Sequence, residues 1–132
     1  MSYRKAVVEE YIDGFRHTDH AAILACLTDD VVWVIHGYST LQGKDAFDGE
    51  IENDAAVGSP TLDLDRLIEE GNTVVAVGHG EMTLKEAGRV PFVFTEVFTF
   101  EGKRICRIET FHINVGDAGE TLFAPPTEGD VA

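Results

Sequence analysis

The sequence predicts an α+β fold, in which three N-terminal helices pack into a curled, mostly antiparallel sheet. Helical spacing of apolar residues is found mainly in the first half of the chain, whereas runs of β-branched and aromatic residues dominate residues 61–115. A group of helices followed by a run of strands is the element order of an α+β fold, and a chain of 132 residues has the length of one such domain. Helices inside a curled sheet form a cone with a hollow centre, and an apolar hollow is by default a small-molecule site.

Three helices are expected before the main run of strands. From Arg4 to Arg16, apolar residues recur at the i, i+3, i+4 and i+7 spacing of an amphipathic helix. Thr18 or Asp19 can cap a shorter helix over Ala21 to Leu27. A third helix is expected over Lys44 to Val57. Its inward-facing residues should be Ala46, Phe47, Ile51 and Ala55.

The strands are expected on either side of this third helix. Val31 to His36 forms the first strand, and a loop over Gly37 to Gly43 follows it. The later strands should be Thr61 to Glu69, Val74 to Leu84, Val90 to Phe100 and Arg104 to Val115. Residues 1–116 are therefore expected to form a single domain, and residues 117–132 an acidic tail containing Pro and Gly.

The chain is strongly acidic, with 10 Lys and Arg against 24 Asp and Glu and a net charge of −14. This balance excludes nucleic acid and anionic membranes as partners, because both need a basic surface. Residues 44–70 carry nine of the acids, which we interpret as solvated helix faces, with a docking surface for a basic partner as the alternative. No membrane span and no secretory signal are recognised, so a cytoplasmic location is expected.

The cysteine and histidine positions do not predict a metal or a cofactor. Cys26 and Cys106 are too few for a disulfide framework or a zinc cluster. The five histidines lack the local spacing of a metal site, such as two histidines one helical turn apart.

Glu96 is the most informative ionisable residue of the sequence. It is the only charged residue inside the strand expected over 90–100. Strand alternation places it on one face with Phe92, Phe94, Phe98 and Phe100. A carboxyl group on such a face is hard to ionise, which raises its pKa and allows it to donate a proton to a ligand oxygen. The alternative is a glutamate that reaches solvent or pairs with Arg104 or Arg107.

His112 is the second candidate for proton transfer. It shares a strand face with Ile108 and Thr110, and we infer that this face lines the hollow. An imidazole there can act as a base or a proton shuttle, and a Glu96–His112 pair would supply an acid and a base from adjacent strands. The alternative is a hydrogen-bonded structural histidine. By strict alternation Cys106 joins the same face. The residues expected to line the pocket are Trp33, Ile35, Met82, Phe94, Phe98, Ile108 and Thr110.

Four segments, read in order, carry a resemblance to a known superfamily. They are residues 7–11 (VVEEY), residues 19–33 with Asp19-His20, Leu24 to Leu27 and TDDVVW at 28–33, residues 43–46 (GKDA) and residues 98–105 (FTFEGKRI). Their order and spacing resemble the nuclear-transport-factor-2-like superfamily, close to its SnoaL-like polyketide cyclase and ketosteroid isomerase branches. The resemblance implies a cone-shaped fold and a homodimer formed through the open face of the sheet. It also implies that Tyr11 occupies the place of an oxyanion-hole tyrosine, and Glu96 that of a carboxylic acid kept protonated by its apolar site.

The chain departs from the enzymes of this superfamily at the decisive positions. Ile35 stands where the isomerase branch has its general base, and it cannot take up a proton. Trp33 and Ile35 stand at the positions of the Tyr/Asn pair of the epoxide hydrolase branch. Gly78 and Gly80 stand at the positions of its Arg/Asp pair. Thr110 replaces the acid expected on the final strand. Neither mechanism transfers intact.

Two hypotheses on function follow. In the first, the domain binds a small, hydrophobic, oxygen-bearing substrate and catalyses a proton transfer, such as isomerisation, cyclisation or dehydration, with Tyr11, Glu96 and His112 as its catalytic residues. In the second, the domain is a non-catalytic ligand-binding or dimeric assembly module that has lost the general base.

Overall fold

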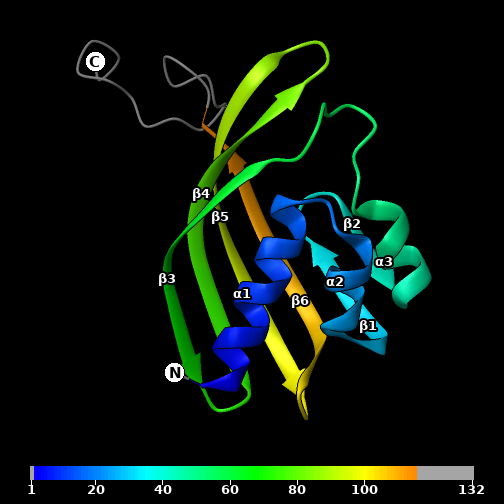
Figure 1. The fold of residues 1–132 in the computed structure, drawn as a ribbon, viewed down its shortest axis with the longest axis vertical. Helices are drawn as coiled ribbons and strands as arrows, with labels where there is room; N and C mark the ends of the chain where they lie inside the picture. The colour runs from blue at the N-terminus through cyan, green and yellow to red at the C-terminus, as the bar shows by residue number, and fades with distance from the viewer. Residues whose placement is uncertain (1, 116–132) are drawn as a thin grey trace.

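The computed structural model describes residues 2–115, which form three helices and six strands (Figure 1). The elements in chain order are α1 (Tyr3–Arg16), α2 (His20–Ala25), β1 (Leu27–Ile35), β2 (Ser39–Gln42), α3 (Lys44–Glu50), β3 (Thr61–Glu70), β4 (Thr73–Leu84), β5 (Gly88–Glu101) and β6 (Arg104–Asn114). The predicted α+β class is confirmed. The acidic tail expected over 117–132 lies outside the described residues.

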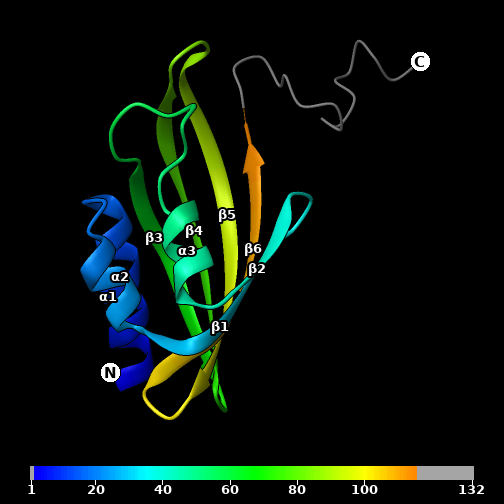
Figure 2. The same ribbon diagram turned by 90° about the vertical axis from the view of Figure 1, so that its right-hand side faces the viewer.

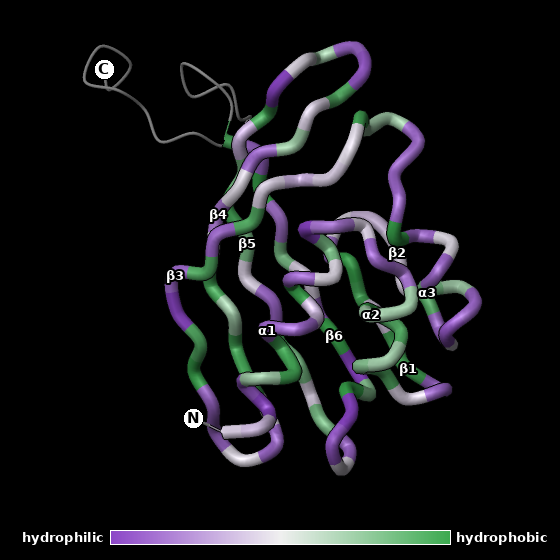
Figure 3. Tube along the Cα trace, in the orientation of Figure 1, coloured by the Kyte–Doolittle hydropathy of each residue, from purple (hydrophilic) through white to green (hydrophobic). Residues whose placement is uncertain are grey.

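All six strands belong to one open sheet with the order β2-β1-β6-β5-β4-β3. Neighbouring strands are antiparallel except β1 and β6, which run parallel. The three helices lie on one side of this curved sheet (Figure 2). Hydrophobic and hydrophilic residues alternate along β3 (Figure 3), as the twofold period of a strand requires when one face is covered.

Local sequence signals explain where the first two helices begin. The Ser2 side chain accepts a hydrogen bond from the Lys5 amide at 3.1 Å and caps α1, and Asp19 caps α2 in the same way through the Ala22 amide. The two helices pack closely at Gly14, because a Cβ atom there would stand 2.6 Å from Cγ1 of Ile23. None of the described helices is long and apolar enough to cross a membrane.

Two predicted segments around the third helix are wrong. Residues 39–42 are not loop but form β2, whose residues pair with β1, for example Leu41 with Trp33. The helix expected to reach Val57 ends at Glu50, and Ala46 and Ala55 are exposed. Beyond it the backbone pairs with the end of β4: the Val57 amide donates to the Thr83 carbonyl oxygen at 2.7 Å, and the Lys85 amide donates to that of Ala55. This tertiary pairing replaces the helical hydrogen bonds of the segment.

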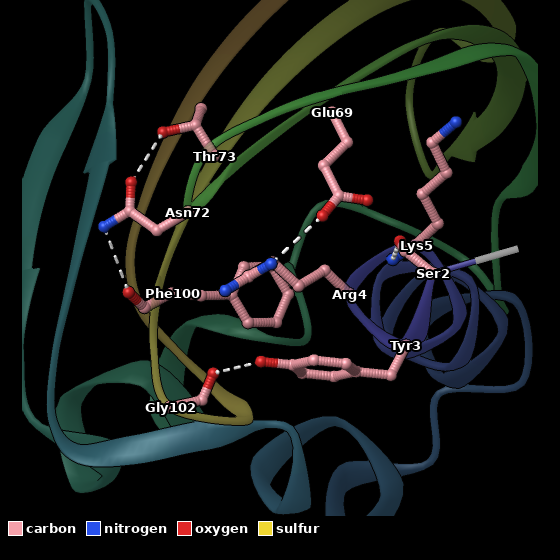
Figure 4. A network of polar contacts seen from close by, with 9 residues as sticks. All are labelled: Ser2, Tyr3, Arg4, Lys5, Glu69, Asn72, Thr73, Phe100 and Gly102. Atoms are coloured by element: carbon pink, nitrogen blue, oxygen red, sulfur yellow. Dashed lines mark hydrogen bonds and ion pairs between the residues drawn. The ribbon is translucent and has the colours of Figure 1, made fainter.

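A polar network fixes the start of α1 to the end of the cone where the β3–β4 and β5–β6 turns lie (Figure 4). Arg4 pairs with Glu69 at 3.1 Å, and the Tyr3 hydroxyl donates to the carbonyl oxygen of Gly102 in the β5–β6 turn. Asn72, in the β3–β4 turn, donates to the Phe100 carbonyl oxygen. These contacts close this end of the cone.

Candidate functional site

A cavity of about 500 Å³ opens at the end of the cone away from this network. Its walls come from the end of α1, from β1, from residues 50–60 and from the inner face of β3–β6. Buried side chains such as Trp33 and Phe94 form its interior, and exposed ones such as Glu52 and His112 mark its opening. The buried part of the cavity is apolar except for Glu96 and Thr110, which is the form that small-molecule sites take.

Six of the residues singled out in the sequence line this cavity: Trp33, Met82, Phe94, Glu96, Thr110 and His112. Four others do not line it: Tyr11, Ile35, Phe98 and Ile108. Phe98 and Ile108 are fully buried in the core behind the cavity, and Ile35 is partly buried against that core.

Glu96 lies on the phenylalanine face of β5, where the predicted alternation is confirmed because Phe92, Phe94, Phe98 and Phe100 are all buried. The residue is 8 % exposed and its carboxyl group makes no ion pair among the described residues, whereas Arg107 contacts Glu109. Burial raises the pKa of Glu96 to about 7, although a hydrogen bond from Thr110 acts in the opposite direction. Glu96 is therefore placed to exchange a proton near neutral pH.

Two buried side chains connect Glu96 to β1. The Thr110 hydroxyl donates to Oε2 of Glu96 at 2.6 Å, and Nε1 of Trp33 donates to the same hydroxyl oxygen at 2.9 Å. Glu96 and Thr110 are register partners on β5 and β6. Trp33 reaches Thr110 because β1 runs parallel to β6, beside it, with Trp33 in register with Ile108.

Tyr11 is enclosed by aromatic rings in the core. Its ring centroid is 5.1 Å from that of Phe15 and 5.2 Å from that of Phe98, and only 1 % of the residue is exposed. The buried hydroxyl has no hydrogen-bond partner among the described residues. Burial raises the pKa of Tyr11 well above its usual value, and the negative charge of nearby Glu96 adds to this. The hydroxyl thus stays protonated beside the cavity wall.

His112 stands at the opening of the cavity. Its ring stacks on Phe92 with centroids 4.5 Å apart, and its Nε2 lies 2.8 Å from Oδ1 of Asn114. His112 is in register with Phe94, one inward-facing position from the Glu96–Thr110 pair. The described residues contain no hydrogen bond between His112 and Glu96, so the two members of the predicted acid–base pair are not hydrogen-bonded to each other.

The ionisable side chains at the opening are mostly acidic. Glu50 and Glu52 line it, and no lysine or arginine is among the described lining residues. His20 of α2 lies between Asp48 and Glu52, with its ring nitrogens 2.6 Å and 2.7 Å from their carboxylate oxygens. These contacts raise the pKa of His20 above its usual value. Within residues 2–115 no group of three or more His, Cys, Asp or Glu side chains is arranged to hold a metal ion.

A family model for SnoaL-like domains matches residues 8–108. The chain belongs to the SnoaL-like domain family. This confirms the superfamily resemblance carried by the four sequence segments. A comparison with curated proteins gave no match.

Solved structures share the fold of this SnoaL-like domain. An NTF2-like protein of unknown function from Burkholderia pseudomallei is 26% identical, with a TM-score of 0.79 over 86% of this chain and 92% of that chain. An LEH-like epoxide hydrolase from M. tuberculosis is 20% identical, with a TM-score of 0.73 over 84% and 83% of the two chains. TerC, co-crystallised with polyporic acid, is 23% identical, with a TM-score of 0.74 over 85% and 92%.

Sequence reasoning missed several lining residues of this SnoaL-like domain. Phe15 and Phe92 were visible in the helical and strand patterns of the chain, but neither was assigned to the pocket. The wall formed by residues 50–60 was hidden, because the same residues were assigned to the third helix and its end. Their irregular backbone carries no periodic signal.

The two glycines on β4 have a structural role. A Cβ atom on Gly78 would lie 2.6 Å from Cζ of Phe94, and one on Gly80 would lie 3.0 Å from Cζ of Phe92. Both would also approach backbone oxygens of β3 too closely. The missing side chains therefore make room for two rings of the cavity wall and for the neighbouring strand.

Proposed function

We propose that this SnoaL-like domain binds a small, largely hydrophobic, oxygen-bearing molecule and catalyses a proton transfer on it, as in isomerisation, cyclisation or dehydration of a carbonyl compound. The observation that carries the proposal is the carboxyl group of Glu96. It is buried on an aromatic face, lines the cavity and has a pKa raised by burial to about 7. An acid with a pKa near the working pH can both donate and accept a proton.

Glu96 alone can serve a reaction that moves a proton within one molecule. The ionised carboxylate takes a proton from the carbon next to the ligand's carbonyl group, and the resulting carboxylic acid returns that proton to the oxygen or to another carbon of the ligand, which regenerates the carboxylate. His112 at the opening would exchange protons with solvent. Tyr11 does not line the cavity, so its predicted role, a hydrogen bond to the same ligand oxygen, requires a movement that brings its buried hydroxyl into contact with the ligand.

The lining favours an uncharged ligand over an anion. Glu50, Glu52 and Glu96 line the cavity, and no described lining residue is basic. A carboxylate or phosphate would therefore enter an apolar space against like charges. TerC, which shares this fold, was co-crystallised with polyporic acid, and this supports an organic small molecule as the class of ligand.

A binding module without turnover is the second candidate. The observation that favours it is the separation of the ionisable groups: His112 has Asn114 as its partner and no hydrogen bond to Glu96. Ile35, at the place of the isomerase base, does not line the cavity. In this case Glu96 would only orient a ligand.

We also propose a homodimer through the outer face of the sheet. Val93, Phe111 and Ile113 are 40 %, 41 % and 56 % exposed there, and Val93 and Ile113 are neighbours in register. Partly buried Val75 and Val97, also register partners, continue the same face. A contiguous exposed apolar patch of this kind is typical of an interaction surface, and a twofold axis lets it cover itself.

The proton-transfer proposal can be tested without knowing the natural substrate. The probe is 2-tetralone, a bicyclic ketone with acidic α-protons, incubated with the protein in D₂O while exchange of these protons is followed by ¹H NMR. We expect the wild type to accelerate exchange, Glu96→Gln to lose at least about 100-fold of that acceleration, and the matched surface variant Glu101→Gln to retain it. If 2-tetralone binds but its proton exchange is not accelerated, the result would contradict catalysis and support the binding module without turnover. No perturbation of the cavity resonances by the ketone would overturn both.

A further inference from the structure

We infer that Trp33 and Thr110 are positioning residues that hold the ionisable proton of Glu96 on the oxygen that faces the cavity. The inference rests on the proposed function, because it assigns a direction to the proton that Glu96 would transfer. Neither residue need touch the ligand's reacting atoms for this role. Their effect acts through the carboxyl group.

The chemistry of the three side chains fixes the direction of the hydrogen bonds. An indole Nε1 is a donor only, so Trp33 donates to the Thr110 hydroxyl oxygen over 2.9 Å. A threonine hydroxyl carries a single proton, and Thr110 directs it to Oε2 of Glu96 over 2.6 Å. Oε2 is therefore the acceptor of this bond when Glu96 is ionised, and also when the proton of the neutral acid is on Oε1.

We call the chain of hydrogen bonds from Trp33 through Thr110 to Glu96 the relay. The packing around it holds it in place. Trp33 stacks on Phe47, with centroids 4.3 Å apart and ring planes 24° apart, and Phe15 meets its edge. Trp33, Thr110 and Glu96 are 7 %, 9 % and 8 % exposed. They come from three adjacent strands, β1, β6 and β5, whose ladder fixes their relative positions. The indole has little freedom to leave the threonine.

The remaining oxygen of Glu96 then carries the titrating proton. Oε1 has no hydrogen bond among the described residues, and Glu96 lines the cavity. If the proton sat on Oε2 instead, it would have to be donated to Thr110, and the Thr110 hydroxyl proton would lose its acceptor in a site that is nearly closed to water. Leaving a buried donor unpaired is the costlier arrangement. The relay thus presents the acidic proton to the ligand.

The same relay makes Glu96 a stronger acid than burial alone would. The Thr110 hydroxyl stabilises the ionised carboxylate, and its hydrogen bond lowers the pKa of Glu96 against the effect of burial. Donation by Trp33 polarises the Thr110 hydroxyl and strengthens the second bond. Loss of either donor should therefore raise the pKa of Glu96.

The test is a ¹³C NMR titration of the glutamate side-chain carboxyl groups in the ligand-free protein, with Glu96 assigned from the resonance missing in Glu96→Gln. We expect Thr110→Val to raise the pKa of Glu96 by about 1 or more, and Thr110→Ser, which keeps the hydroxyl, to leave it close to the wild-type value. Trp33→Phe should give a smaller rise, which disappears in a Thr110→Val background because the relay is already broken. Thr95→Val, on β5 next to Glu96 but on the outer face, is the matched control and should change nothing.

The possible results separate the relay from the proposed function. A wild-type pKa well above 4.5 that Thr110→Val leaves unchanged would overturn the relay and leave Glu96 as the acid. So would a pKa change in Trp33→Phe that persists fully in the Thr110→Val background. An ordinary wild-type pKa would remove Glu96 from the acid role, whatever the variants do. If Trp33→Phe fails to fold, the comparison of Thr110→Val with Thr110→Ser still decides whether the hydroxyl acts on Glu96.

Discussion

Glu96 and Thr110 face each other across β5 and β6, and a 2.6 Å hydrogen bond joins the hydroxyl of one to the carboxyl group of the other. This is the only hydrogen bond that the described residues give to the Glu96 side chain. A single neutral donor does not replace the hydration that the carboxylate loses on burial, so the folded protein favours the protonated form. Several measurable consequences follow from this balance and from the surrounding geometry.

Glu96 should make folding stability depend on pH. Its pKa is raised in the folded state, from 4.5 to about 7, so its stabilising contribution is complete below pH 4.5 and is lost as the pH rises through 7. Relative to the wild type, Glu96→Gln should therefore gain about 3 kcal/mol in free energy of unfolding between pH 4 and pH 8. Urea unfolding at the two pH values measures this difference. A difference that does not change with pH would contradict the raised pKa.

Replacing glycine by alanine should change the stability of the protein in opposite directions at two positions. Gly80→Ala places a Cβ atom against the backbone of β3 and 3.0 Å from the Phe92 ring, and we expect it to cost about 1–3 kcal/mol of stability. Gly49→Ala, in α3, meets nothing within 4 Å and should stabilise the protein by about 0.5–1 kcal/mol. Thermal unfolding of the two variants checks both signs. A neutral Gly80→Ala would show that β3 and β4 can move apart at this point.

His20 should act as a pH-dependent link between α2 and the wall of the cavity. Its pKa is raised by Asp48 and Glu52, so its stabilising contribution is complete below about pH 6.5 and is lost as the pH rises through the raised folded-state pKa. His20→Gln should therefore destabilise the protein at pH 6 more than at pH 9. Unfolding curves at both pH values test this, with His17→Gln, whose imidazole is 69 % exposed, as the matched control. Equal losses at both pH values would argue against a charged His20.

The proposed dimer predicts a strong effect of one charge on the outer face. Ile113→Lys places a cation in the apolar patch and should convert a dimer into a monomer in sedimentation equilibrium. Tyr38 is 70 % exposed in the turn between β1 and β2, so the variant Tyr38→Lys is the control and should stay dimeric. A wild type that sediments as a monomer at all concentrations would refute the interface.

The acidic lining predicts discrimination by ligand charge. At pH 8 we expect 2-naphthol to bind at least about 10-fold more tightly than 2-naphthoate, which has a similar ring but carries a negative charge. Glu50→Gln should reduce this preference, whereas Asp54→Asn, in the same segment but outside the cavity lining, should not. Isothermal titration calorimetry gives both affinities. Equal affinities in the wild type would show that the carboxylates do not select the ligand.

Periodicity in the sequence was sufficient for the elements that bury one face. The stripe of α1 and the capping Asp19 appear as predicted, and so does the phenylalanine face of β5 with Glu96 on it. These features depend on residues close in sequence, whose spacing matches the helix or strand period. The α+β class follows from their order.

The register of the strands and the course of the irregular segments could not be predicted from periodicity in the sequence. Strict alternation placed Cys106 on the pocket face, but Thr99 pairs with Arg107 and Phe100 with Ile105, so Cys106 is the extra, unpaired residue of a bulge in β6. Ile105 and Ile108 point inward as a result, and Cys106 contacts the carbonyl oxygen of Thr99 outside the cavity lining. A bulge is decided by the partner strand, so it leaves no trace in the local pattern.

The sequence by itself determined that a carboxyl group, Glu96, lies on an aromatic strand face, because alternation is a local property of the backbone. Only the tertiary structure decided what surrounds that carboxyl group. The parallel pairing of β1 with β6 brings Trp33 within 2.9 Å of Thr110, and residues 50–60 close one wall of the cavity. Both depend on contacts between segments that are distant along the chain, whose pairing is set by the packing of the whole sheet and not by the order of residues within any one strand.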